Sequence, residues 1–196
     1  MTKFTTIAVT TATIGILLGV AVSPANAVPN TDDISSTVSG GTLTAFATAP
    51  DSMTGVTLDG SSTLNSTGTA TGWTITNARG DDAAWTLSAS ATDFTSAAGT
   101  VDTTARTLDV GNLVITPGTV VAGTGSDAAP STSAVTMSTS SQALVTSSTN
   151  GRGTYTLSAV GYNLNVPADT YRSNFPGAFG VGVLNPYVST ITFTIA

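Results

Sequence analysis

The sequence predicts an all-β protein of one domain, an antiparallel β-sandwich of Greek-key-like or barrel-like form. Three observations support this. Short segments alternate large apolar residues with Ser or Thr, which is typical of half-buried strands. Clusters of Gly, Pro and Asn separate these segments at near-regular intervals. After residue 28 no window has the i, i+3, i+4, i+7 apolar pattern of an amphipathic helix. Many short, evenly spaced strands favour a sandwich or a barrel.

Ten segments carry strand signals, either alternation or enrichment in β-branched and aromatic residues. In chain order they are 42–48, 54–58, 72–77, 84–91, 108–116, 134–137, 142–146, 154–160, 162–166 and 188–195. Turn residues divide them, and these are Gly60-Ser61, Arg79-Gly80, Pro117-Gly118, 123–130, Asn150-Gly151 and Pro176-Gly177. Alternation then predicts the inward faces, which are Trp85/Leu87/Ala89/Ala91, Tyr155/Leu157/Ala159 and Ile191/Phe193/Ile195.

The segment 73–87 contains both tryptophans of the chain. Trp73 and Trp85 each begin an alternation of apolar and hydroxyl residues, and the polar run Asn-Ala-Arg-Gly-Asp-Asp lies between the two strands. This pattern predicts a β-hairpin with both indoles on the core face. As the largest side chains of the protein, they should fill much of the core.

The N-terminus resembles a cleaved secretory signal. An uncharged run from Ile7 to Val22 ends at Pro24, and Ala25-Asn26-Ala27 supplies the small residues of a cleavage site. The run is shorter than the roughly 20 residues of a membrane span. We therefore expect residues 1–27 to be removed, 28–40 to form a flexible leader and 41–196 to form the domain. An uncleaved N-terminal anchor is the alternative. No second long apolar run follows, so no membrane span is expected after removal.

Composition excludes several classes of partner. The formal charge is −6, and Lys3, the only lysine, would be lost with the signal. An acidic surface repels phosphate backbones, so nucleic acid and anionic lipid are not expected partners. The chain has no cysteine, so an exported domain of this size would be held together by its core alone.

The residue types needed for most catalytic sites are missing. The sequence has no His, Cys or Glu, which removes the usual general bases, the thiol nucleophile and the ligands of zinc and copper. Aspartate pairs remain, at 32–33 and at Asp81-Asp82. Adjacent carboxylates in a turn diverge, and no Asp-x-Asp-x-Asp spacing supports a calcium loop. We expect neither an enzyme nor a bound metal or cofactor.

Candidate binding residues lie in two polar loops. The first is the turn with Arg79, Asp81 and Asp82, which also spells Arg-Gly-Asp; here Arg79 could instead pair with an aspartate and brace the turn. The second loop mixes aromatic, cationic and amide groups suited to stacking and bonding a sugar ring. Its candidates are Tyr171, Arg172, Asn174 and Phe175. An exposed 171–179 patch would favour glycan or partner binding, whereas a buried one would favour a plain scaffold.

Two stretches of sequence resemble the WxL-domain proteins of Gram-positive cell surfaces. The proximal motif is Trp85-Thr86-Leu87, preceded by an Asn-x-Arg-Gly turn and followed by a Ser/Thr/Ala run ending in Phe94. The family's distal motif places a Tyr shortly before a second Trp-x-Leu. Here Tyr187 is present, but residues 191–195 read Ile-Thr-Phe-Thr-Ile. Phe193 or Ile191 could fill the tryptophan's volume, and the resemblance covers roughly residues 40–196.

The resemblance implies a secreted, non-catalytic surface protein held non-covalently on peptidoglycan or another wall glycan, with other surface proteins as possible partners. A second hypothesis has a different origin. The terminal strand 188–195 would offer unpaired backbone for β-augmentation, so the protein could be the structural subunit of a surface fibre or layer. Retention by purified cell wall, or fibre formation without wall, separates the two.

Overall fold

The computed structural model describes residues 32–148 and 151–196. The predicted signal, 1–27, and the start of the predicted leader, 28–31, lie outside these residues. The chain divides into two units, residues 1–37 and 38–196. Within the first, residues 32–37 are exposed and have no regular secondary structure. The domain boundaries at residues 27 and 40 stay predictions.

The described part of the second unit forms four antiparallel sheets, which confirms the all-β prediction. Sheet I consists of β1 (Leu43–Phe46), β3 (Thr74–Asn77), β12 (Gly153–Leu157) and β8 (Val120–Ala122). Sheet II consists of β10 (Val135–Thr136), β7 (Leu113–Thr116), β13 (Val160–Val166) and β2 (Leu64–Ala70). Sheet III consists of β15 (Ile191–Ile195), β4 (Trp85–Ala91), β11 (Gln142–Ser147) and β9 (Ser131–Thr132). Sheet IV consists of β14 (Tyr187–Val188), β5 (Phe94–Ser96) and β6 (Arg106–Leu108). A 3₁₀ turn, η1 (Val110–Asn112), precedes β7. Among the described residues, no helix has the length and hydropathy needed to cross a membrane.

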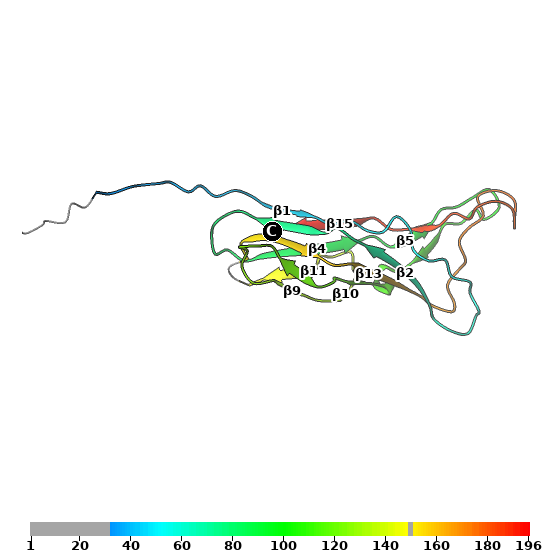
Figure 1. Ribbon diagram of the computed structural model, residues 1–196. Helices are drawn as coiled ribbons and strands as arrows, with labels where there is room; N and C mark the ends of the chain where they lie inside the picture. Colours follow the sequence, from blue (N-terminus) through cyan, green and yellow to red (C-terminus); the bar gives the residue numbers. More distant parts are fainter. Residues whose placement is uncertain (1–31, 149–150) are drawn as a thin grey trace, which may run out of the picture. The chain divides into compact units, whose positions relative to one another are not determined.

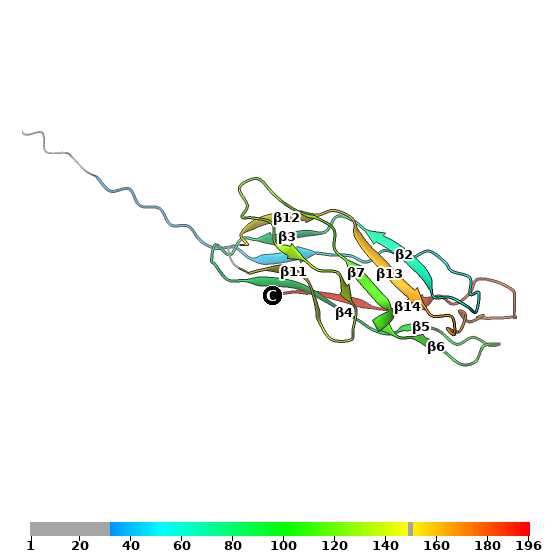
Figure 2. The ribbon, with the colours of Figure 1, turned by 90° about the horizontal axis from the view of Figure 1, so that it is seen from below.

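Short breaks connect successive strands of different sheets (Figures 1 and 2). β4 continues into β5 after residues 92–93, and β12 continues into β13 after residues 158–159. Each two-residue break changes which side chains face inward. In β4 the odd-numbered residues are buried, whereas in β5 Phe94 and Ser96 are buried. The chain thus builds sheets I and II from one set of bent strands and sheets III and IV from another.

Aromatic contacts join sheet I to sheet III. Trp73, just before β3, packs edge-on against Phe193 of β15, with ring centroids 5.0 Å apart and planes at 77°. Trp85 of β4 lies 5.9 Å from Tyr155 of β12. Both indoles are almost fully buried, so each reaches from its own sheet to an aromatic ring of the other. The first pair is edge-to-face and the second is tilted, and aromatic pairs at such distances add to the stabilisation from burial.

Each buried indole donates to a backbone carbonyl that a second buried side chain also uses. Trp73 Nε1 and the Tyr162 hydroxyl both donate to Thr48 O, at 2.9 Å each. Trp85 Nε1 and Asn77 Nδ2 both donate to Gly151 O, also at 2.9 Å each. The polar atoms of the core are therefore satisfied without water, and burial raises the pKa of the Tyr162 phenol.

The predicted hairpin between Trp73 and Leu87 is wrong. β3 pairs with β1 and β12, whereas β4 pairs with β11 and β15. Residues 78–84 carry the chain from sheet I to sheet III. Alternation requires only that both strands bury one face, and two strands in facing sheets meet that requirement as well as two neighbours in one sheet.

Several other strand predictions also differ from the structure. Residues 54–58 are not a strand; Thr54 donates one backbone bond to Thr67 O of β2 and the rest is a loop. The predicted strand 108–116 is interrupted by η1, and 188–195 is interrupted at residues 189–190. Ala159 lies in a break and is exposed. β2, β5, β8 and β9 were not predicted, because they are short or consist mostly of small polar residues.

Candidate functional site

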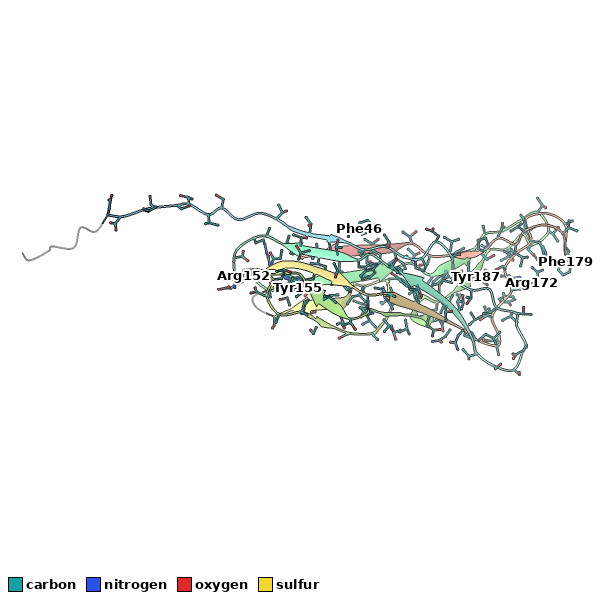
Figure 3. All side chains as sticks on the ribbon, in the orientation of Figure 1. Phe46, Arg152, Tyr155, Arg172, Phe179 and Tyr187 are labelled. Carbon is teal, nitrogen blue, oxygen red and sulfur yellow. The ribbon has the colours of Figure 1, made fainter. Side chains whose placement is uncertain are left out.

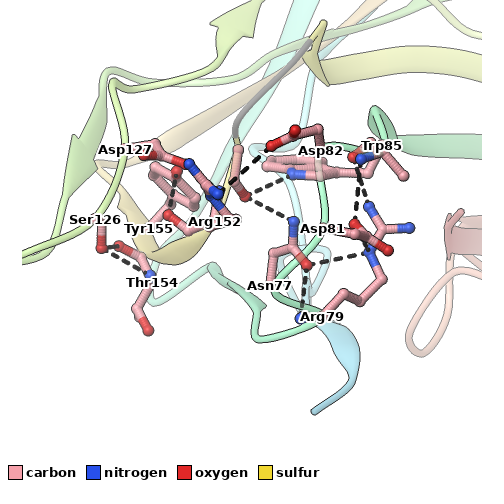
Figure 4. Close-up of polar contacts among 12 residues, drawn as sticks. Asn77, Arg79, Asp81, Asp82, Trp85, Ser126, Asp127, Arg152, Thr154 and Tyr155 are labelled. Carbon is pink, nitrogen blue, oxygen red and sulfur yellow. Dashed lines mark hydrogen bonds and ion pairs between the residues drawn. The ribbon is translucent and has the colours of Figure 1, made fainter. Parts of the chain in front are cut away.

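The turn with Arg79 is braced by contacts within the chain (Figure 4). Arg79 Nε donates to Asn77 Oδ1 at 3.1 Å, and Nη2 donates to Ala83 O at 2.8 Å. Its guanidinium also lies 3.6 Å from Asp81. The side chain is thus used to hold the crossing between sheets I and III, and the Arg-Gly-Asp tripeptide is not presented as an extended loop.

Asp82, the other candidate of this turn, belongs to a second ion-pair cluster. Arg152 lies between Asp82, at 3.5 Å, and Asp127, at 3.0 Å. The hydrogen bond from the Arg152 side chain is the main cause that lowers the pKa of Asp127. All three groups are partly exposed, so the pairs are worth little for stability. The two aspartates do, however, neutralise the charge of Arg152, which is the cation that an external ligand would need.

The second group of candidates lies between β13 and β14, at the end of the unit opposite Arg152 (Figure 3). Asn174 is buried, and its Nδ2 lies within hydrogen-bond distance of Ser96 O, Ala97 O and Thr104 O, at 3.3, 3.0 and 2.9 Å. Its backbone N–H donates to Ser96 Oγ. Asn174 therefore fastens the 167–186 loop to the loop between β5 and β6, and it is not available to a ligand.

Arg172 and Phe175 are organised by one carboxylate. Arg172 binds Asp102 through Nη1 and Nη2, at 2.8 and 3.2 Å, and the Phe175 N–H donates to the same side chain at 2.7 Å. These bonds, the one from Arg172 first, lower the pKa of Asp102. The Arg172 guanidinium lies 4.6 Å from the Phe175 ring and 4.9 Å from the Phe179 ring, within the range of cation–π attraction.

Tyr171 lies beside this stack, and the guanidinium group of a second arginine, Arg106, lies over its ring. The Arg106 Cζ is 3.9 Å from the centre of the Tyr171 ring. The Tyr187 hydroxyl donates to Tyr171 O at 2.8 Å, which fixes the backbone beneath the ring. Tyr171 is 62% exposed and Phe179 is 68% exposed. We call this surface the aromatic end, defined by Arg106, Tyr171, Arg172, Phe175 and Phe179.

A groove of about 1050 Å³ adjoins the aromatic end. Tyr171, Arg172 and Tyr187 form part of its lining, and the 49–58 loop forms another part. Its floor is apolar, built from side chains such as Leu113, Leu164 and Val166. An apolar cleft of this size with a few polar groups at its rim is typical of a ligand site.

Gly99 controls how closely the two loops of the aromatic end approach. A Cβ at residue 99 would collide with Phe175 O and lie 2.6 Å from Pro176 Cα, both backbone atoms. Gly177 has no atom within 4 Å of such a Cβ. We expect Gly99→Ala to separate the loops and to weaken ligand binding at the aromatic end about tenfold or more, with Gly177→Ala near wild type. Titration of both variants with the same ligand checks this. Equal dissociation constants for Gly99→Ala and Gly177→Ala would contradict it.

Sequence reasoning placed Tyr171, Arg172 and Phe175 correctly in one loop but missed their partners. Arg106 and Asp102 lie some 70 residues earlier and carry no motif. Phe179 is the last residue of the 171–179 patch but was not among the predicted binding residues. The described residues include no group of three or more carboxylates that could hold a metal ion. The arrangement combines exposed aromatic rings with two guanidinium groups and the Asp102 carboxylate.

A family model described as "WxL domain surface cell wall-binding" matches residues 27–175 of the chain. That match spans well over half of the 196 residues. The chain belongs to the WxL family. No curated protein and no solved structure matched it. The WxL domain is a cell wall-binding surface domain and its family is not described as enzymatic, so this chain is a wall-associated surface protein.

The proximal WxL motif lies in the core and does not form a binding surface. Trp85 and Leu87 are each 1% exposed. The distal motif region, from residue 176 onward, lies outside the family match. There Phe193 packs on Trp73 at the position where the family has a tryptophan strand, while Tyr187 is half-buried and supports Tyr171. Trp85 and Leu87 of the proximal motif and Phe193 of the distal region therefore pack within the sandwich.

Proposed function

We propose that this WxL domain is secreted and binds peptidoglycan non-covalently through its aromatic end. The observation that carries the proposal is the exposure of Tyr171 and Phe179, which lie next to the guanidinium groups of Arg106 and Arg172. Exposed aromatic faces stack on sugar rings, and guanidinium groups bind carboxylates and hydroxyls at their edges. Isolated large apolar residues are common on surfaces, but a cluster of them beside cations is not.

The aromatic end is favoured over the Arg79 turn because it adds exposed rings to its charges: Arg172 is paired with Asp102, but Tyr171 and Phe179 stay open to solvent. Arg79 and Arg152 at the turn are each held by an aspartate, and Arg79 also bonds backbone carbonyls. At the aromatic end the rings are open to solvent while the Asp102 and Asn174 bonds hold the loops in place. A preformed platform loses little conformational entropy when it binds.

Co-sedimentation with purified peptidoglycan tests the proposal. We expect the double variant Tyr171→Ala/Phe179→Ala to bind at least tenfold more weakly, about 1.4 kcal/mol, because it removes both stacking faces. Phe46→Ala is the matched control: Phe46 is 58% exposed but lies on β1, away from the aromatic end (Figure 3). It should bind as wild type. Equal sedimentation of all three proteins would contradict the proposal.

One observation favours a second function, assembly through edge strands. β15 forms a ladder with β4 alone and is an edge of sheet III. Beside it lies a groove of about 290 Å³ lined by Phe46, Phe193 and Ile195 among others. A strand of another molecule could pair there by β-augmentation. Concentration-dependent fibres without wall, seen by electron microscopy and reduced by Phe46→Ala, would support this function; a monomer at all concentrations would contradict it.

A further inference from the structure

Arg106 differs from the other arginines of the described residues in having no acidic partner. Arg79, Arg152 and Arg172 each lie within 4.0 Å of an aspartate carboxylate. No ion pair or hydrogen bond engages the Arg106 guanidinium among residues 32–148 and 151–196; its contact is with the Tyr171 ring. The hydrogen bond from Arg172 is the main cause that lowers the pKa of Asp102, and the charge of Arg106 helps to lower it, but the Asp102 carboxylate is bonded by Arg172 and not by Arg106.

The Tyr171 ring holds this guanidinium in a way that leaves its donors free. The Arg106 Cζ lies 3.9 Å from the ring centre, and a cation held over a ring in this way spends no N–H on an oxygen acceptor, so its donors remain available to a ligand. Arg106 is half-buried, and a ring on one face restricts the rotamers of its long side chain. Such a preorganised fork fits a carboxylate, which accepts two parallel N–H bonds.

The apolar groove adjoins the same ring. Tyr171 lines the groove, together with the 49–58 loop and apolar side chains such as Leu164. A ligand bound at this ring would therefore be in reach of both a cation and an apolar surface. A neutral glycan strand has no carboxylate for Arg106.

We propose that the peptide stem of peptidoglycan, with its free carboxylates, is the part of the wall that Arg106 and the groove recognise. The inference rests on the proposed function and names the chemistry of its ligand. A carboxylate of the stem forms a bidentate pair with Arg106, and the short apolar side chains of the stem lie in the groove. Sugar rings contact the remaining exposed face at Phe179.

Calorimetric titration tests this with two synthetic stem pentapeptides, one with free carboxylates and one with all carboxylates amidated. We expect the acid form to bind wild-type protein at least tenfold more tightly than the amide. Arg106→Gln should remove that difference, and Arg106→Lys should restore part of it because lysine keeps the charge but not the fork. Arg152→Gln, which makes the same charge change at the other end, is the matched control and should keep the full difference.

Equal binding of the acid and amide peptides by wild-type protein would overturn the inference, and that comparison does not depend on any variant folding. A folded Arg106→Gln variant that still binds the acid peptide more tightly than the amide, by the same factor as wild type, would also overturn the inference. If wild-type protein sediments with peptidoglycan but does not distinguish the peptides, the inference fails and the proposed function stands. If it does not sediment, both fail.

Discussion

Replacing Trp85 with alanine is expected to lower the free energy of unfolding by about 3–5 kcal/mol. The indole is 1% exposed and lies against Tyr155 across the sandwich. Alanine would leave a large cavity and would also remove the donor to Gly151 O. A loss of this size is a large fraction of the 5–15 kcal/mol typical of a domain. Urea denaturation followed by far-UV circular dichroism measures it.

Two variants on the same strand calibrate that effect. Trp85→Phe keeps most of the volume and loses the indole N–H, so it should cost less than alanine; Asn77 still donates to Gly151 O. Thr86→Ala alters the outward side of β4 and should change the free energy of unfolding by less than about 0.5 kcal/mol. If Trp85→Ala were no more damaging than Thr86→Ala, the cross-sandwich role of the indole would be refuted.

Asn174→Ala is expected to weaken wall binding although the variant retains every exposed side chain of the aromatic end. The amide satisfies the carbonyls of Ala97 and Thr104 from a buried position. Removing it leaves Thr104 O without this donor, whereas Ala97 O keeps the bond from Asn185; the loss should cost about 1–3 kcal/mol in free energy of unfolding. The loop carrying Tyr171 would keep its bonds to Asp102 but lose the buried amide bonds to the loop between β5 and β6. Denaturation and co-sedimentation with peptidoglycan measure the two effects.

Asn185→Ala is the matched control for that experiment. Asn185 also donates through Nδ2 to Ala97 O, at 2.9 Å, but the bond is exposed and water can replace it. It should lose less stability than Asn174→Ala and keep most wall binding. A variant at Asn174 that unfolds like wild type and still sediments would show that the two loops are held together by other contacts.

The sequence predicted the class of fold better than its connectivity. The buried face of β4 agrees residue by residue with the alternation. Alternation is a local signal, however, and it cannot say whether two inward-facing strands are neighbours or lie in opposite sheets, which is why the hairpin at 73–87 was wrong. It also assumes one period, whereas the breaks at 92–93 and 158–159 shift the inward positions from odd to even residues.

The site was predictable only in part for a similar reason. Tyr171, Arg172 and Phe175 are close in sequence, so their mixed chemistry was visible. The role of Arg106 was not visible in the sequence, because the Tyr171 ring is 65 positions away. The two side chains meet only in the folded protein, where Arg106 lies on β6. The Asn174 amide resembled a ligand contact in sequence, but burial makes it a structural bond. A side chain's chemistry can be read from sequence, whereas its accessibility depends on the fold.

The shared carbonyls of the core have a consequence for experiment. The chain has two tryptophans, and each indole N–H is bonded to a backbone oxygen in a different segment, Thr48 O or Gly151 O. In a ¹⁵N-labelled sample, two side-chain signals would therefore report separately on the segment leading into the groove loop and on the segment leading into β12. Labelling with ¹⁵N alone would therefore provide one spectroscopic reporter for each of these two segments.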